Sequence, residues 1–331
     1  MKAIIPVAGV GTRLRPHTYT QPKPLIPVAG KPIIFFIIDQ LVAVGVTEFV
    51  FIIGHLGDKI EVEVTEAYPD LEKIFVVQNH RSGIAHAIWT AKDTFVDSEQ
   101  VLIILGDTII DDDVQPFIDS PQSCFGVKKV NDPREFGIAE FNDVGEVVRV
   151  VEKPQIPISN MALVGWYKIT DVKALLAAIQ YNLDNEITTY GEYQLTDAIM
   201  RMIENQHQFK AIPIKNWFDC GKREILLLTN ETLLKKYAVQ NKTEHDYPNT
   251  IIIPPVSIGE HCEITDSIIG PYVTIGNQAK IKKAIVNDSI IGDFSTIETV
   301  ILNRSIIGSD ASIKGTNQSL NIGDNTEIDF S

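Results

Sequence analysis

The last third of the chain repeats an isoleucine-glycine pair at a nearly constant spacing. The pairs begin at Ile258, Ile275, Ile291, Ile307 and Ile322, which lie 15 to 17 residues apart. A second isoleucine follows each of them after six residues, at positions 264, 281, 297, 313 and 328. An antiparallel sheet would explain the isoleucines but not the six-residue period, which is typical of a parallel β-helix whose coils turn at small residues. We therefore expect about five coils of a parallel, left-handed β-helix.

The residues before this repeat show a different pattern, in which short β-branched runs alternate with longer amphipathic stretches. Strands are expected at 2–7, 48–53, 73–78, 101–107, 123–130, 162–169 and 209–214, and helices at 32–45, 82–93 and 191–206 among others. This alternation is typical of βαβ units. It predicts a Rossmann-like α/β domain with a mixed, mostly parallel sheet over residues 1–240. The polar, proline-containing segment at residues 240–249 marks the boundary, and the β-helix domain is expected over residues 241–331.

Charge and composition limit the classes of partner. The chain has 331 residues, 44% of them hydrophobic, and a formal net charge of −14. Such a charge argues against binding to nucleic acid or to an anionic membrane. Neither a membrane-spanning run nor a signal peptide is recognisable, and the three cysteines show no zinc or disulfide pattern. We therefore expect a cytoplasmic enzyme or binding protein without a nucleic-acid or membrane partner.

One basic segment stands out in this acidic chain, PVAGVGTRLRPHTYTQPKPL at residues 6–25. It follows the first predicted strand and should leave the sheet at its carboxyl edge, where α/β proteins bind ligands. Gly9 and Gly11 can let backbone N–H groups approach a phosphate, and Arg13 can hold two phosphate oxygens. Its prolines disfavour a helix. We predict a phosphate-binding loop, although Leu14 stands where a dinucleotide fingerprint has its third glycine.

Residues 6–32 resemble the signature of the sugar nucleotidyltransferases, the nucleoside-diphosphate-sugar pyrophosphorylases. They read G-x-G-T-R-L-x-P-x-T, then P-K-P-L, then G-K-P. Further motifs that resemble this family follow in order: Gln78 with Gly83-Ile84-Ala85-His86-Ala87, Leu105-Gly106-Asp107, Phe136-Gly137-Ile138, Glu152-Lys153-Pro154, Gly165-Trp166-Tyr167, Gly191-Glu192-Tyr193 with Thr196-Asp197, and Trp217-Phe218-Asp219-Cys220-Gly221. The resemblance covers about the first 235 residues. Long-form members of the family also carry a C-terminal hexapeptide β-helix.

The resemblance implies an enzyme in which a sugar 1-phosphate attacks the α-phosphorus of a nucleoside triphosphate and pyrophosphate leaves. Catalysis then depends on neutralising and aligning two polyanions, and no general base is required. Arg13 is implied to hold the departing pyrophosphate, Lys23 the α-phosphate and Lys153 the attacking sugar phosphate. Asp107 and Asp219 are implied ligands of Mg²⁺, which prefers carboxylate and phosphate oxygens.

The binding residues are implied in the same way. The nucleotide would be bound by Ala8, Gly9, Gly11, Thr12, Gln78 and Gly83, and the sugar phosphate by Gly137, Glu152, Lys153, Gly165 and Glu192. Ala8 departs from the commoner family pattern, which has a glycine there, although its backbone N–H is retained. We interpret His86, Asp111–Asp113, Trp166 and Trp217 as packing or solvated residues rather than as site residues.

Several alternatives stay open. The resemblance favours dTTP and glucose 1-phosphate, with UTP next and guanylyl transfer to mannose 1-phosphate behind both. A regulatory subunit without activity would tend to lose the implied basic and metal-binding residues, which are all present. An acyltransferase site on the β-helix would need a histidine base, and that region holds only His261. The flat aliphatic sides of a β-helix favour instead a homo-oligomer.

Overall fold

Contacts between residues divide the computed structural model into two compact units, Met1–Gly9 with Phe36–Phe218, and Val10–Phe35 with Asp219–Ser331. The structure describes residues 1–237, 247–315 and 320–329. The expected domain boundary at residues 240/241 lies outside this part of the chain. The second unit joins the basic segment, from Val10 onward, with the C-terminal repeat.

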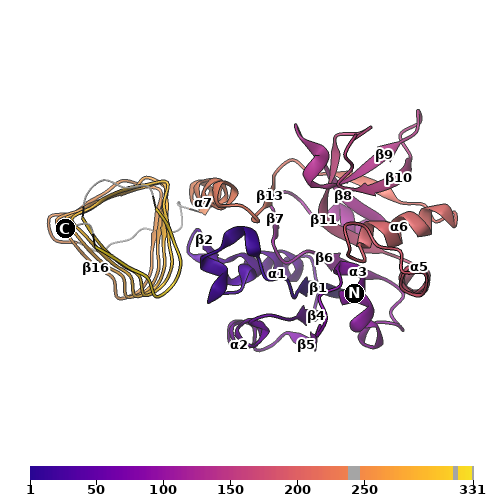
Figure 1. Cartoon of the computed structure of the whole chain (residues 1–331), viewed down its shortest axis with the longest axis horizontal. Helices are drawn as coiled ribbons and strands as arrows, with labels where there is room; N and C mark the ends of the chain where they lie inside the picture. Colours follow the sequence, from indigo (N-terminus) through magenta and orange to yellow (C-terminus); the bar gives the residue numbers. More distant parts are fainter. Residues whose placement is uncertain (238–246, 316–319, 330–331) are drawn as a thin grey trace. The chain divides into compact units, whose positions relative to one another are not determined.

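The first unit contains a nine-stranded mixed sheet (Figure 1). Its parallel part orders β6 (Val101–Ile104), β1 (Lys2–Val7), β4 (Glu48–Ile53) and β5 (Glu72–Val77). From β6 it continues through β11 (Met161–Ile169), which pairs antiparallel with β6, β8 (Cys124–Lys129) and β9 (Gly137–Phe141). β12 (Lys210–Pro213) runs parallel to β8, and β10 (Val147–Glu152) antiparallel to β9. The predicted mixed α/β sheet is confirmed.

Two features of the sheet differ from the sequence prediction. The strand expected at 101–107 ends at Ile104, because the chain turns after it and Thr108 N–H donates to the Leu105 carbonyl at 3.2 Å. A short strand, β7 (Thr108–Ile110), follows this turn. The β9–β10 hairpin was not predicted, because half-exposed and charged positions interrupt its apolar pattern.

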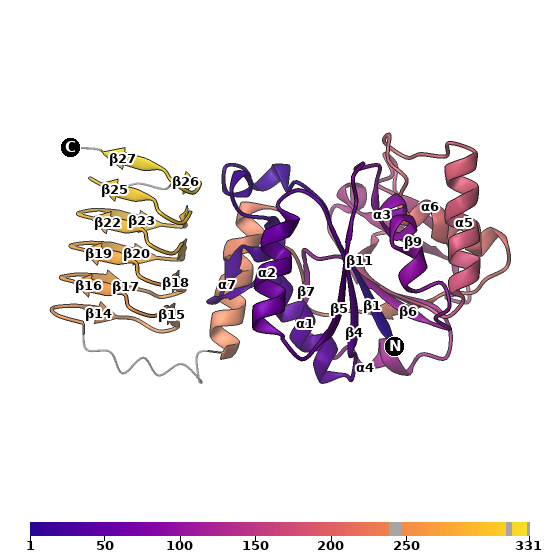
Figure 2. The ribbon, with the colours of Figure 1, turned by 90° about the horizontal axis from the view of Figure 1, so that it is seen from below.

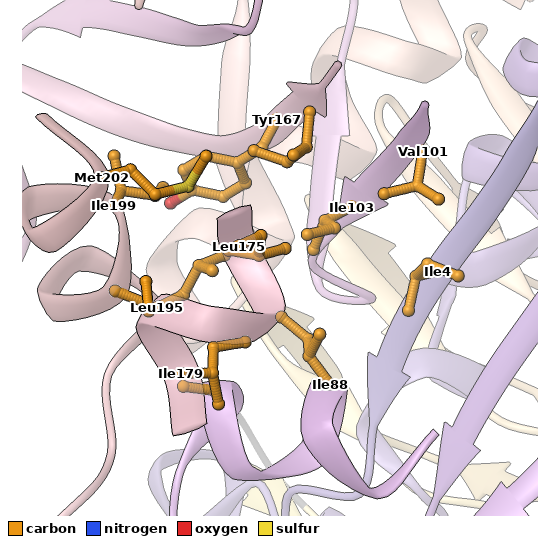
Figure 3. Packing of buried hydrophobic residues seen from close by; sticks show 14 of the residues in the cluster. Ile4, Ile88, Val101, Ile103, Tyr167, Leu175, Ile179, Leu195, Ile199 and Met202 are labelled. Carbon is orange, nitrogen blue, oxygen red and sulfur yellow. The ribbon is translucent and has the colours of Figure 1, made fainter. Parts of the chain in front are cut away.

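Helices cover the sheet of the first unit. They are α2 (Gly57–Ala67), α3 (Ile84–Thr90), α4 (Gln115–Asp119), α5 (Val172–Asp184) and α6 (Leu195–Glu204), while α1 (Ile33–Ala43) crosses the boundary between the units. In α5, Asp171 caps the first turn by accepting from Ala174 N–H at 2.8 Å, and buried residues recur at helical spacing. Figure 3 shows residues of α3, α5 and α6 packed with Ile4, Val101 and Ile103 of the sheet. No helix in the described residues is long and apolar enough to cross a membrane.

The second unit contains three parallel sheets that form the β-helix (Figure 2). The first sheet is β14 (Ile251–Ile252), β17 (Ile268–Ile269), β20 (Ile285–Asn287) and β23 (Ile301–Asn303). The second is β15 (Val256–Ile258), β18 (Val273–Ile275), β21 (Ser289–Ile291), β24 (Ile306–Ile307) and β26 (Asn321–Ile322). The third is β16 (Glu263–Thr265), β19 (Lys280–Lys282), β22 (Thr296–Glu298), β25 (Ser312–Lys314) and β27 (Glu327–Asp329).

The two predicted isoleucine series stack in register through these sheets. Ile275 pairs with Ile258 and Ile291 in the second sheet, and Ile297 pairs with Ile281 and Ile313 in the third. The glycines are required by the close stacking, since a Cβ on Gly276 would lie 2.6 Å from the nitrogen of Asp293 in the next coil. The parallel β-helix predicted from the repeat is confirmed.

Candidate active site

The end of β1 is closely surrounded by glycines of the first unit. A Cβ on Gly54 would lie 2.8 Å from the carbonyl oxygen of Ala8, and a Cβ on Gly106 would lie 2.2 Å from Cγ1 of Val7. Gly9 follows at the surface, and a Cβ there would meet nothing within 4 Å. The chain is therefore tightly packed at Val7 and Ala8, and its backbone becomes exposed at Gly9, where a ligand can approach.

Gln78 follows β5 and is buried. Its Nε2 donates to the carbonyl of Gly83 at 3.2 Å and lies 3.1 Å from Nδ1 of His86. Burial, and to a smaller extent His80, lowers the pKa of His86, so the neutral ring can accept this hydrogen bond. His86 thus orients the Gln78 amide, in agreement with the packing role predicted for it.

Gly83, which caps α3, has φ of 108° and lies against the backbone of Tyr193. A Cβ on Gly83 would come 2.4 Å from the Tyr193 carbonyl oxygen. Ala85 N–H donates to that oxygen at 3.0 Å, and Tyr193 N–H donates to Ser82 at 2.8 Å. Two motifs more than 100 residues apart in sequence therefore meet at a glycine that no other residue could replace without a shift.

Glu152 and Gly137 are directly paired across the β9–β10 hairpin. The Glu152 carboxylate accepts a hydrogen bond from the Thr196 hydroxyl at 3.0 Å and lies 3.3 Å from Nζ of Lys153. A Cβ on Gly137 would stand 3.0 Å from both Glu152 Oε2 and Thr196 Cγ2. The first unit therefore brings together the predicted sugar-phosphate residues Gly137, Glu152 and Lys153.

The backbone at Lys153 is held in a special conformation. Its φ is 39°, its N–H donates to Phe136 at 3.0 Å, and its carbonyl accepts from the Tyr190 hydroxyl at 2.6 Å. Glu192 lies nearby in sequence in an exposed turn, where its carboxylate accepts from Gln194 at 3.2 Å. No contact joins Glu192 to Glu152 or Lys153 among those recorded for the described residues.

Asp107 lies in the turn after β6, and Gly165 of β11 packs against this turn. Gly165 has φ of 81°, and a Cβ on it would lie 3.0 Å from the Leu105 side chain and 3.1 Å from the Thr108 hydroxyl oxygen. That hydroxyl is 3.5 Å from the half-buried Asp107 carboxylate. Gly165 therefore supports the turn that carries Asp107.

In the second unit the basic segment forms three single turns of 3₁₀ helix, Thr12–Leu14, His17–Tyr19 and Lys23–Leu25. Gly11, with φ of 67°, starts the first, and a Cβ there would lie 2.9 Å from Thr18 and 3.1 Å from Lys23. The Thr18 hydroxyl donates to the Gly11 carbonyl at 2.9 Å. The segment folds back on itself and forms no α-helix, while Thr12 remains exposed.

Arg13 and Lys23 converge on Asp219, the last residue of β13 (Trp217–Asp219). Nη2 of Arg13 and Nζ of Lys23 each lie 3.9 Å from a different oxygen of the Asp219 carboxylate. The Lys23 side chain is 10% exposed, whereas that of Arg13 is 54% exposed. The second unit therefore forms a cationic cluster around one carboxylate, with a buried and an accessible cation.

The absence of a side chain at Gly221 leaves space for the Arg13 guanidinium. A Cβ on Gly221 would lie 2.5 Å from Nη2 of Arg13, and Gly221 N–H donates to the Asp219 carbonyl at 2.7 Å. The need for a glycine at position 221 is thus explained by Arg13, which lies more than 200 residues earlier in the sequence.

Asp107 and Asp219 have the oxygen donors that Mg²⁺ prefers. The described residues contain no group of three His, Cys, Asp or Glu side chains that could hold a metal ion. Mg²⁺ usually takes one or two carboxylates and completes its shell with phosphate oxygens and water. Each carboxylate, Asp107 in the first unit and Asp219 in the second, therefore has donor atoms that suit Mg²⁺ carried by a phosphate substrate.

The predicted site omitted three residues. Thr196 holds Glu152, Tyr190 holds the Lys153 backbone, and Asp197 lies beside them with a buried Oδ2 that has no hydrogen-bond partner in the described part of the chain. Burial raises the pKa of Asp197, and Glu152 adds to this shift. The Thr196-Asp197 motif was the available signal.

The residues set aside from the site have structural surroundings. Trp166 is buried against Phe117, and the Trp217 ring lies 5.0 Å from that of Phe136. Asp112 and Asp113 accept backbone hydrogen bonds, from Lys215 and Gln115 respectively. The His261 side chain is 80% exposed, 3.9 Å from the Glu260 carboxylate.

Comparison with known proteins agrees with this arrangement. The nucleotidyl transferase family model matches residues 2–236, and a model for a GlmU-like, C-terminal hexapeptide matches residues 243–291. The chain is 30% identical to the low-salt glycan biosynthesis nucleotidyltransferase Agl11 of Haloferax volcanii, over 90% of this chain and 89% of that protein. It is 34% identical to a glucose-1-phosphate thymidylyltransferase of Streptomyces antibioticus, over 90% of this chain and 82% of that protein.

A solved structure shows the same fold. The crystal structure of a UDP-glucose pyrophosphorylase complexed with UDP-glucose aligns with a TM-score of 0.61 and 22% identity, over 71% of this chain and 98% of that one. The family match covers the parts of both units in which the motifs lie. The chain therefore belongs to the nucleotidyl transferase family and carries a hexapeptide-repeat β-helix after its nucleotidyl transferase region.

Proposed function

We propose that the protein transfers a nucleotidyl group from dTTP to glucose 1-phosphate and releases pyrophosphate. The observation that carries this proposal is the pair of cations, Arg13 and Lys23, held on the Asp219 carboxylate in a protein of net charge −14. A polyanionic substrate needs such a local cluster, since the rest of the protein repels it. Membership of the nucleotidyl transferase family supports the reaction class.

In the proposed reaction a phosphate oxygen of glucose 1-phosphate forms a bond to the α-phosphorus of the triphosphate. The bond from this phosphorus to the β-bridging oxygen breaks, and that oxygen leaves with pyrophosphate. Lys23 stabilises the charge that grows on the α-phosphate, and the accessible Arg13 holds the leaving pyrophosphate. Mg²⁺, bound with the triphosphate by Asp107 and Asp219, would neutralise further charge.

The sugar phosphate is assigned to the Glu152 cluster. Glu152 can accept hydrogen bonds from sugar hydroxyls, because its carboxylate is already oriented by Thr196. Lys153 can pair with the phosphate, since its Nζ is tethered only 3.3 Å from Glu152 and its side chain is 48% exposed. Because Gly137 has no side chain, Glu152 and Thr196 can pack closely against its backbone, which helps to fix the Glu152 carboxylate.

The choice of base is assigned to Gln78 and Gly83, whose geometry is fixed by His86 and Tyr193. The relative from Streptomyces antibioticus, which is named a thymidylyltransferase, supports dTTP. Pyrophosphate release should be measured with dTTP, UTP, GTP and ATP against glucose 1-phosphate and mannose 1-phosphate. The proposal predicts the highest kcat/KM for dTTP with glucose 1-phosphate. Preference for UTP would reassign the base, and preference for GTP with mannose 1-phosphate would refute both substrate assignments.

We also propose that the chain forms homo-oligomers through the first sheet of the β-helix. Ile251, Ile268, Ile285 and Ile301 are paired in register along its outer surface, and three of them are at least 38% exposed. The other two outer surfaces differ from this isoleucine ladder. Residues of the second sheet are buried beside α7 (Arg223–Tyr237), and the third carries the ion pairs Glu263–Lys280 and Glu298–Lys314.

A second copy suits the isoleucine ladder because a two-fold axis along the β-helix would cover the exposed isoleucines of one copy with the same residues of the other. Ile285→Lys should convert the oligomer to a monomer in light scattering after gel filtration. Thr296→Lys, which adds the same charge to the third sheet, should leave it assembled. A monomeric native protein, or an assembled Ile285→Lys variant, would contradict this interface.

A further inference from the structure

The segment that carries Arg13 and Lys23 lies against the β-helix at two places. Both contacts are internal to the second unit, which contains Val10–Phe35 and Asp219–Ser331. The first contact involves Pro16, His17 and Thr20, between the two cations in sequence. The second involves Ala29 and Gly30, after Lys23.

At the first contact the segment replaces a coil. Gly259, Gly276, Gly292 and Gly308 occupy equivalent corners, and a Cβ on each would come within 2.4–2.7 Å of backbone atoms of the following coil. At Gly323, the next corner in the series, the nearest atoms belong instead to Pro16, whose Cβ would lie 2.8 Å from the added Cβ. Pro16 therefore packs on the Gly323 corner as a coil would.

The polar groups of the same corner continue this pattern. In the inner coils a side-chain oxygen accepts from the backbone of the preceding coil, as Asp293 does from Asn277 N–H at 2.6 Å. Asp324 does the same for Ser309 at 2.8 Å, and its second oxygen accepts from the Thr20 hydroxyl. His17 Nε2 lies 2.5 Å from the Asn321 side-chain oxygen. Asp324 is thus bonded both to the preceding coil and to the cation-bearing segment, and Asn321 is bonded to that segment.

At the second contact Asn230 of α7 joins the segment to the β-helix. Its side-chain oxygen accepts from Ala29 N–H at 2.8 Å and from the Thr274 hydroxyl at 2.6 Å, and its amide donates to the Tyr272 carbonyl at 3.1 Å. Asn230 is fully buried. A Cβ on Gly30 would lie 2.3 Å from the Ser257 hydroxyl, so the hairpin of β2 (Pro27–Val28) and β3 (Lys31–Pro32) lies directly against the second sheet.

We propose that Asn321 and Asp324 of the β-helix are positioning residues for nucleotide binding, because they hold the segment that presents Arg13 and Lys23. The β-helix is then a structural part of the triphosphate site as well as a surface for assembly. The effect on catalysis rests on the proposed function, whereas the docking of the segment does not. Neither residue touches the reacting groups, so the expected defect is confined to the nucleotide.

Asp324→Ala and Asp293→Ala form a matched pair for the test. Each removes a carboxylate that accepts from a neighbouring coil, but only Asp324 also bonds to Thr20. Hydrogen exchange of the amides of residues 12–25 should rise about tenfold in Asp324→Ala and stay unchanged in Asp293→Ala. Thr20→Val, which leaves the β-helix intact, should reproduce part of the rise.

Steady-state kinetics provide the second measurement. Asp324→Ala and Asn321→Ala should raise the KM for the nucleotide about tenfold and leave the KM for the sugar phosphate within about twofold. Unchanged exchange of residues 12–25 in both variants would overturn the proposal. An equal rise of the KM for the nucleotide and the KM for the sugar phosphate would contradict a positioning role in nucleotide binding. Faster exchange in a protein without nucleotidyl transfer would refute the proposed function but support the docking.

Discussion

The ammonium group of Lys23 lies 3.9 Å from the Asp219 carboxylate, although nearly 200 residues separate the two in sequence. The lysine side chain is only 10% exposed, so its charge is held in a partly desolvated place. A lysine in such surroundings interacts strongly with any phosphate that approaches it. This relationship makes the first prediction specific.

Lys23→Ala should lower kcat by about 100-fold or more, the usual cost of removing a group that stabilises transition-state charge. Lys128→Ala is the control, because the Lys128 ammonium group donates to the Lys215 carbonyl at 2.7 Å and lies outside the predicted site. Circular dichroism should show both variants folded. Near-normal turnover of Lys23→Ala would remove Lys23 from the reaction.

Gly221→Ala should weaken nucleotide binding without unfolding the protein. The new methyl group would lie 2.5 Å from Nη2 of Arg13, so the guanidinium must move. We expect an increase of about tenfold in the KM for the nucleotide, as for loss of one charged hydrogen bond. In Arg13→Ala the same glycine substitution should have a smaller effect, because the displaced guanidinium is gone and only the approach of the new methyl group to Asp219 Oδ1, at 2.9 Å, remains. Additive effects in the double variant would contradict this explanation.

Thr196→Val should raise the KM for the sugar phosphate and leave that for the nucleotide unchanged. The substitution keeps the shape of the side chain but removes the hydroxyl that donates to Glu152 at 3.0 Å. The expected increase is about fivefold to tenfold, the loss of one hydrogen bond to a carboxylate. Thr196→Ser, which retains the hydroxyl, should restore the native KM. A defect in both variants would point to packing rather than to the hydrogen bond.

Stability should fall in mild acid because of His17. Burial lowers the pKa of this imidazole, against smaller opposing effects of Asn321 and Asp324 and a further lowering by Arg223. The unfolded chain binds the proton near the ordinary pKa of about 6.5, whereas the folded protein does so only at lower pH. The contribution of His17 to the free energy of unfolding is therefore complete above about pH 6.5. It is lost as the pH falls from there toward the lower pKa of the folded protein.

The measurement is chemical unfolding at pH 7.5 and 5.5 for the native protein and for His17→Gln. The variant should lose less stability on acidification, by up to roughly 1 kcal/mol per pH unit. His261→Gln is the control, since that side chain is 80% exposed. An identical pH dependence in the native protein and His17→Gln would show that His17 does not contribute.

Ile297→Ala should destabilise the β-helix by about 3 kcal/mol, because the residue is fully buried and stacked between Ile281 and Ile313. Ile301→Ala, at a residue 40% exposed, should cost less than about 1 kcal/mol in the monomer. Thermal unfolding monitored by circular dichroism gives both values. Equal losses in the two variants would contradict the assignment of inward and outward positions.

The amino-acid sequence determined much of the fold by itself. The isoleucine-glycine period predicts the β-helix because each coil repeats the same local demand, an aliphatic residue inside and a glycine at the crowded corner. The strands β1, β4 and β6 of the parallel part of the sheet are also recognisable from the sequence, since most of their residues are buried and the strands read as continuous apolar runs. The β9–β10 hairpin is not, because packing at a partly exposed edge does not require a continuous apolar run.

The motifs likewise predict which residues make up the candidate site, but not what holds them. Arg13 near Gly221, Lys23 near Asp219, and Glu152 on Thr196 are contacts between distant parts of the chain. No local pattern encodes them, because each depends on how separate elements pack. The same is true of the contact between Pro16 and Gly323. The sequence predicts this glycine as a corner of a coil, but only the tertiary structure shows that the cation-bearing segment, rather than another coil, packs on it.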